Sequence, residues 1–167
     1  MRIFKFGGAS VKDADGVKNV LSVLKTVGHD DVLIVISAMG KMTNALEEVI
    51  KNYFNKSSEF NASLQEVKKY HNQILMDLFE DEDNDVFFAV NSHLADLEYF
   101  LRSNKSPNYS FVYDQVISYG EIISTITEQN LSMLDYNQNS NYKIVKAYNL
   151  LGQEIPVDTN NEIIIVK

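Results

Sequence analysis

The chain has 167 residues, of which 45% are hydrophobic and 23% are charged, the composition of an ordinary globular domain with a core of its own. Its net charge of -8, without a clustered basic stripe, argues against nucleic-acid binding, and its lack of cysteine excludes disulfides and thiolate metal sites. No apolar run reaches the roughly 20 residues of a membrane span, and the N-terminus has no signal-peptide pattern, so we expect a cytoplasmic protein.

The beginning of the chain predicts a βαβ unit. Residues 2–6 read as a strand, and residues 13–27 repeat apolar side chains at the spacing of an amphipathic helix. Residues 32–36 are a continuous β-branched run, which is typical of a strand buried on both faces. Strand, helix and strand of these lengths favour a right-handed parallel crossover.

The middle of the chain is expected to be helical. A helix over residues 43–54 is expected to begin with Thr43 or Asn44 as its cap. Three longer helices follow, over residues 64–79, 86–101 and 111–131. The composition then changes, and residues 142–146 and 162–166 read as two strands of a small β-hairpin.

The first candidate site lies at the end of the first strand. Lys5 is a cation within an apolar strand, and a buried lysine is costly unless an anion satisfies it. Gly7 and Gly8 let backbone N–H groups approach a ligand, and the helix start after them favours negative charge. This pattern indicates a site for an anion, most naturally a phosphoryl group. The alternative is a strand that ends in a glycine turn, with Lys5 reaching the surface.

The second candidate site is the loop that follows the second strand, residues 37–44 (Ser-Ala-Met-Gly-Lys-Met-Thr-Asn). Ligands of open α/β sheets bind outside the carboxyl ends of the strands. We therefore expect this loop to converge with the Gly7-Gly8 turn. The alternative is an ordinary connection that begins a helix.

The third candidate site is Ser118-Tyr-Gly-Glu121 in the last helix. Ser118 and Glu121 share a helix face with Ser124, among apolar neighbours. Gly120 inside a helix suggests that another segment approaches closely. In this setting Glu121 needs hydrogen-bond donors, which a ligand or, alternatively, the neighbouring backbone supplies.

No metal site is expected. The acidic run Glu80–Asp85 lacks the spacing and the glycine of an EF-hand loop, and we expect a solvated connection there. The histidines at 29, 71 and 93 share no ligand spacing.

Taken together, the segments 5–11 (Lys-Phe-Gly-Gly-Ala-Ser-Val), 37–44 and 118–121 resemble the start of aspartate kinase, in the amino-acid kinase superfamily. The resemblance covers roughly residues 1–130 and implies an α/β fold: a truncated three-layer α/β/α amino-acid-kinase-like fold with a parallel βαβ start, a helical insert and a C-terminal β-hairpin. It makes residues 1–131 the N-terminal lobe of a kinase domain and 132–167 a divergent tail.

The resemblance also implies a chemistry. The family phosphorylates the β-carboxylate of L-aspartate with ATP and Mg, toward lysine, threonine and methionine. By resemblance, Lys5 stabilises the transferred phosphoryl group, and Gly7, Gly8 and Ser10 line the phosphate loop.

The amino-acid side of the site follows from the same resemblance. Ser37 and Thr43 would help to hold aspartate, and Glu121 would bind its α-amino group. A half-buried carboxylate with a cationic partner agrees with this role.

Two departures from the family pattern limit the expected activity. Ala9 stands where the family most often has threonine. The family's second half, which supplies the adenine and ribose pocket, is not recognisable in the 167 residues. We therefore expect little or no catalysis from the chain alone.

Other interpretations stay open at this point. The chain can be a non-catalytic remnant or an assembly module that keeps the fold, or a different amino-acid or carbamate-type kinase, against which the Ser118–Glu121 motif argues. The long helices over 64–79 and 86–101 have apolar faces that either form a homo-oligomer or pack on each other.

Overall fold

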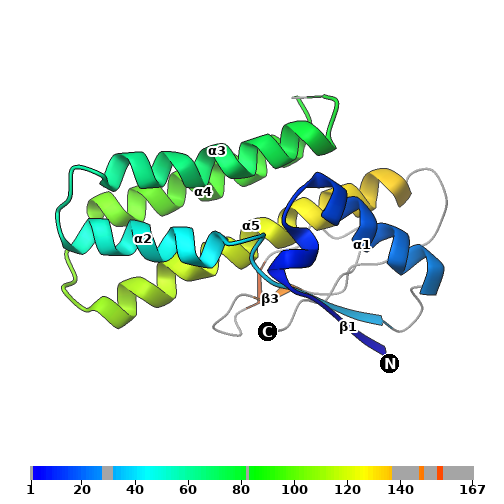
Figure 1. The fold of residues 1–167 in the computed structure, drawn as a ribbon, viewed down its shortest axis with the longest axis horizontal. Helices are drawn as coiled ribbons and strands as arrows, with labels where there is room; N and C mark the ends of the chain where they lie inside the picture. Colours follow the sequence, from blue (N-terminus) through cyan, green and yellow to red (C-terminus); the bar gives the residue numbers. More distant parts are fainter. Residues whose placement is uncertain (1, 28–31, 82, 137–146, 149–153, 156–167) are drawn as a thin grey trace.

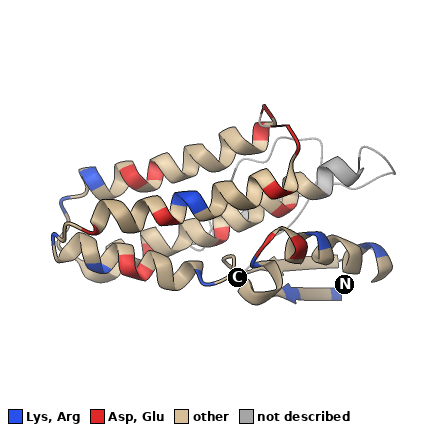
Figure 2. Ribbon diagram, turned by 45° about the horizontal axis from the view of Figure 1, so that its top comes forward, with Lys and Arg blue, Asp and Glu red and all other residues tan. Residues whose placement is uncertain are grey.

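The computed structural model describes residues 2–27, 32–81, 83–136, 147–148 and 154–155, and beyond Leu131 it describes the backbone only. In this part of the chain a small parallel sheet joins a larger helical body (Figure 1). Basic and acidic residues are interspersed over the helices (Figure 2). No helix in the described ranges is both long and apolar enough to cross a membrane.

The predicted βαβ unit is present. Strand β1 (Arg2–Phe6) pairs in parallel with β2 (Val32–Ile36), and Lys5 lies opposite Val35 in the register. A short 3-10 helix, η1 (Gly8–Val11), and helix α1 (Ala14–Val27) make the crossover. Helix α1 turns Ala14, Val17 and Val20 into the core, which confirms its predicted amphipathic spacing.

Both strands are less buried than their sequences predict. Lys5 is exposed and Ile3 retains 61% of its accessible surface, so the expectation of a buried lysine is wrong. In β2 only Ile36 is buried, and the four residues before it are half-buried. The physical reason is the width of the sheet. Within the described ranges β1 and β2 pair only with each other, so each has one edge that no described strand pairs.

Four helices form the body of the molecule: α2 (Met42–Phe54), α3 (Phe60–Leu78), α4 (Asp85–Ser103) and α5 (Tyr109–Tyr136). They contact one another in a ring, α2 with α3, α3 with α4, α4 with α5 and α5 with α2. Helix α5 also reaches the sheet and packs against β2 (Figure 1). It therefore joins the helical body to the βαβ unit.

The helix starts differ from those expected. Helix α2 begins at Met42 after Lys41, without a capping hydrogen bond from a side chain, so the prediction of Thr43 or Asn44 as cap is wrong. Both residues lie inside the first turn. Helix α4 does have a capping side chain, because Asn84 Oδ1 accepts from the Val86 amide at 3.0 Å.

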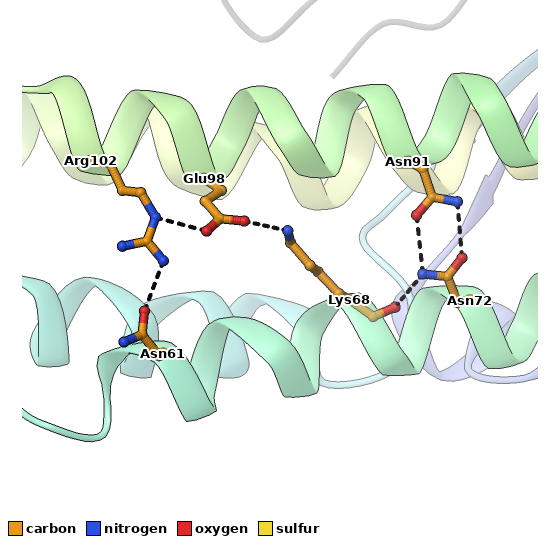
Figure 3. A network of polar contacts seen from close by, with 6 residues as sticks. All are labelled: Asn61, Lys68, Asn72, Asn91, Glu98 and Arg102. Atoms are coloured by element: carbon orange, nitrogen blue, oxygen red, sulfur yellow. Dashed lines mark hydrogen bonds and ion pairs between the residues drawn. The ribbon is translucent and has the colours of Figure 1, made fainter.

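Polar side chains tie α3 to α4 along one flank (Figure 3). Glu98 accepts from Lys68 and from Arg102 Nε, and Asn72 exchanges two hydrogen bonds of 3.1 Å with Asn91. The hydrogen bonds from Lys68 and Arg102 hold the pKa of Glu98 below its ordinary value. The two long helices thus pack on each other, as one of the two interpretations expected.

The tail is described only in short pieces. Ala147–Tyr148 (β3) and Glu154–Ile155 (β4) pair in an antiparallel manner. The predicted strands 142–146 and 162–166 lie outside the described residues. A small parallel sheet with helix α1 in its crossover and helix α5 against β2 confirms the α/β class and a truncated α/β fold.

Candidate functional site

The loops after β1 and β2 converge as the sequence predicts. The Ser37 amide donates to the Phe6 carbonyl at 3.0 Å, and the Gly40 amide donates to the Gly8 carbonyl at 2.9 Å. These two bonds continue the pairing of the strands into the loops. The carboxyl ends of both strands therefore form one continuous edge, where ligands of such sheets bind.

Gly8 is required by the close approach of the two loops. A Cβ at this position would lie 2.6 Å from the Ala38 carbonyl oxygen and 2.7 Å from the Gly40 carbonyl oxygen. Gly7 is different, because a Cβ there would meet nothing within 4 Å. The glycine pair thus combines one tight contact with one open position beside the end of β1.

Helix α3 holds the same two loops from the side. Gly40 adopts φ +56°, a conformation that favours glycine, and a Cβ there would lie 2.5 Å from the Tyr70 hydroxyl. Tyr70 donates its hydroxyl to the Lys12 carbonyl, and burial raises its pKa, with a further contribution from Asp13. Sequence reasoning missed Tyr70, because the helical spacing that reveals a buried face cannot show which distant loop the face contacts.

Helix α5 contacts the loop from the other side. A Cβ on Gly120 would lie 3.0 Å from the Ala38 Cβ and 3.3 Å from Leu46 Cδ1, which confirms the predicted close approach. The Ser124 hydroxyl donates to the Ser37 carbonyl at 2.9 Å. The three predicted segments therefore meet at the loop that begins with Ser37.

Ser124→Ala should lower the free energy of unfolding by about 1 kcal/mol, because it removes the hydrogen bond that ties α5 to this loop. Urea denaturation measures the change. Ser118→Ala is the matched control, since the Ser118 hydroxyl bonds the Gln115 carbonyl of its own helix at 2.7 Å. Equal losses in the two variants would contradict a role for Ser124 between segments.

The predicted site residues differ in exposure. Lys5 in β1 and Ser10 in η1 are both exposed. The Ser10 amide donates to the Gly7 carbonyl at 2.8 Å. Ser37, Thr43 and Glu121 are half-buried. Glu121 precedes Ser124 by one helical turn, which puts it beside the contact between α5 and Ser37. The site thus has an open cationic side and a more enclosed carboxylate side.

Helix α5 has a buried acidic residue whose burial was not predicted from the sequence. Glu128 is 3% exposed, and neither carboxylate oxygen has a hydrogen-bond partner among the described residues. Burial raises the pKa of Glu128 to about 8, so it is largely protonated at neutral pH. The sequence does contain a signal for this burial: Glu128 lies two helical turns after Glu121, so both residues are on the same side of α5.

His71 is buried in a similar way but is basic. It is 1% exposed, and burial lowers its pKa to about 4, so it is neutral in the core. Within the ranges that the structure describes, no three His, Asp or Glu side chains gather in a way that could hold a metal ion.

This geometry can hold a small zwitterion beside an anion. A half-buried carboxylate favours an ammonium group, while an exposed lysine and a glycine turn at a strand end favour a phosphate or a carboxylate. The loops that follow β1 and β2 share this edge, and helix α5, which carries Glu121, bonds the second loop through Ser124.

Known proteins of one family are similar to this chain. A model of the amino acid kinase family matches residues 1–142. Aspartokinase 1 of Arabidopsis thaliana is 30% identical over 129 residues, which are 74% of this chain and 22% of the relative. Bifunctional aspartokinase/homoserine dehydrogenase 2 of the same plant is 26% identical over 128 residues, 73% of this chain and 14% of the relative.

The fold is also found among solved structures. E. coli aspartokinase III, in complex with aspartate and ADP, superposes with a TM-score of 0.70 at 20% identity, over 89% of this chain and 32% of that one. This chain spans between about a seventh and a fifth of the length of the two curated relatives.

Proposed function

The chain belongs to the amino acid kinase family, and we propose that it is the N-terminal, amino-acid-binding part of an aspartate kinase. Residues 1–131 are then the kinase lobe and residues 132–167 a divergent tail. The reaction of the whole enzyme is transfer of a phosphoryl group from ATP to the β-carboxylate of L-aspartate. A cytoplasmic location and a place in lysine, threonine and methionine biosynthesis belong to the same proposal.

The observation that carries the proposal is the meeting of three segments at Ser37. The Gly8 loop bonds this segment through Gly40, and α5 bonds it through Ser124. Support comes from the relatives, which are aspartokinases, and from E. coli aspartokinase III, whose structure holds aspartate and ADP.

On the amino-acid side, Glu121 accepts hydrogen bonds from the α-ammonium group of aspartate. Its half-buried position strengthens this attraction, because less water screens it. Ser37 and Thr43 donate hydroxyl hydrogen bonds to the carboxylates. The Ser124 bond to the Ser37 carbonyl fixes the loop, so the hydroxyl of Ser37 is held at the same edge as Glu121.

On the phosphoryl side, the chain fits the terminal phosphates of ATP. The open position beside Gly7 leaves room for a phosphate next to the backbone, and the exposed Lys5 lies within the same strand end. Gly8 and Ser10 complete this loop. ATP supplies the phosphoryl group when it is bound, and Mg, which prefers phosphate oxygens and water, would bind with it. The role of Lys5 is to neutralise charge on the transferred group.

The free 167-residue chain is expected to bind aspartate without turning it over, since the adenine and ribose pocket that the family resemblance implies is not recognisable in its sequence. Isothermal titration calorimetry with L-aspartate should detect binding. Glu121→Gln should weaken it by about tenfold or more, because the amide cannot pair an ammonium group as a carboxylate does.

Glu48→Gln is the matched control, because Glu48 is an exposed carboxylate on α2 that pairs only with Lys51 of its own helix among the described residues. Aspartate binding should be unchanged in this variant. Absence of aspartate binding in the parent chain would favour the non-catalytic remnant or assembly module. Aspartate-dependent release of ADP from MgATP by the chain alone would contradict the expected inactivity.

A further inference from the structure

Helix α4 has an exposed face with large aromatic side chains at both ends. Phe88 is 80% exposed and Tyr99 is 73% exposed, the two most exposed large hydrophobic residues in the described part of the chain. Ser92 and Ala95 lie between them and are also exposed. The four positions alternate by four, three and four residues, so they form one continuous stripe along the helix.

The stripe lies opposite the core side of α4. Val86, Val90, Leu94, Leu97 and Leu101 are buried and face the helical body. On one flank, the polar network of Figure 3 binds α4 to α3. On the other flank, rings of α4 contact rings of α5, His93 with Tyr119 and Phe100 with Phe111. The exposed stripe is therefore the side of α4 that no described helix covers.

Two copies of the stripe in antiparallel orientation are complementary to each other. Positions at equal distances from the midpoint between Ser92 and Ala95 pair small with small and aromatic with aromatic, Ser92 with Ala95 and Phe88 with Tyr99. One step further, acidic Asp85 pairs with basic Arg102, and both are exposed. An arrangement with this symmetry fits a two-fold axis, in which the same surface is used by both partners.

We infer that this face binds a second copy of the chain, with the two α4 helices antiparallel about a two-fold axis between Ser92 and Ala95. The small residues at the centre let the helices approach closely. The aromatic rings of Phe88 and Tyr99 from different copies then cover each other on both sides of the axis. Asp85 of one copy comes near Arg102 of the other at each end.

The interface is expected to be weak. A single pair of helices of this length buries less than the roughly 1,200–2,000 Å² of a stable complex. The charge pair at each end adds little, because it is exposed and Arg102 already bonds Glu98 and Asn61 through Nε and Nη2. Association should therefore depend on protein concentration.

Cysteine cross-linking tests the pairing and its direction, because the chain has no cysteine of its own. Phe88→Cys mixed with Tyr99→Cys should give a disulfide-linked dimer under mild oxidation, since these positions face each other. A mixed dimer keeps one intact pair of Phe88 and Tyr99. Each variant alone should cross-link at least tenfold less, because equal positions lie roughly 16 Å apart along antiparallel helices, beyond disulfide reach.

Ala62→Cys, at an exposed position on α3, is the control for random collisions. Sedimentation equilibrium should show a mass that rises with concentration in the parent and stays monomeric in the double variant Phe88→Ser, Tyr99→Ser. Circular dichroism of that variant should be unchanged, since both side chains are exposed. Cross-linking of either single variant as strongly as the mixture, equal cross-linking at Ala62, or a monomeric parent at every concentration would overturn the inference.

Discussion

Gly8→Ala is expected to lower the free energy of unfolding by about 1–3 kcal/mol, as overpacking of a tight contact does, and to abolish aspartate binding. The new methyl group would lie 2.6 Å and 2.7 Å from two carbonyl oxygens. Both belong to the backbone, so neither can rotate away. The β2–α2 loop must move, and the Gly40–Gly8 hydrogen bond of 2.9 Å is lost with it. Urea denaturation and calorimetry with L-aspartate measure the two effects.

The adjacent glycine is the control. Gly7 has φ -78° and ψ 166°, which any residue adopts, and a Cβ there would meet nothing within 4 Å. Gly7→Ala should therefore change stability by less than about 0.5 kcal/mol. It should interfere only with phosphate binding, because the methyl group occupies the open position. Similar losses of stability in both variants would show that the two loops are not in tight contact.

Glu128→Gln is expected to stabilise the chain increasingly as the pH rises. The pKa of Glu128 is raised from 4.5 to about 8 in the folded state, a difference that corresponds to roughly 5 kcal/mol at most. Between these values the folded chain holds a proton that the unfolded chain has released. The contribution of protonated Glu128 to the free energy of unfolding is fully present below pH 4.5. It is lost as the pH rises through about 8.

The amide has no proton to lose, so the variant and its parent should be similar near pH 4.5 and differ by about 2–5 kcal/mol near pH 9. The difference between the two is the quantity to measure, since His71 acts in the opposite direction. Its pKa of about 4 means that stability falls as the pH drops below 6.5.

Glu66→Gln, at an exposed position on α3, should give no pH-dependent difference. A parent and a Glu128→Gln variant with parallel stability curves between pH 5 and 9 would mean that Glu128 is ionised in the folded chain. The measurement is urea denaturation at a series of pH values.

Much of the secondary structure could be predicted because it follows from apolar spacing. The stripes of α1, α3 and α4 repeat every three or four residues, and each faces the core. The capping residues of the helices could be predicted from the sequence less accurately than the helices themselves. Thr43 is a good capping residue by type, yet α2 begins one residue earlier, because Met42 is buried and packs in the core.

The meeting of the two loops could also be predicted, from the rule that the ends of parallel strands share an edge. The exposure of Lys5 could not be predicted, because it depends on how many strands and layers cover β1, and local sequence does not contain that information. The same limit applies to Gly40, whose positive φ and contact with Tyr70 arise from a residue far along the chain.

The ring of helices has a consequence for the order of folding. Three of its four contacts join helices that are adjacent in the chain, from α2 to α5. Such contacts close short loops and cost little chain entropy, so they form early. The parallel pairing of β1 with β2 requires a crossover, and the contact of α5 with β2 spans most of the described chain. We therefore expect the contact of α5 with β2, and with it the Ser124 bond to the Ser37 loop, to form after the contacts between adjacent helices.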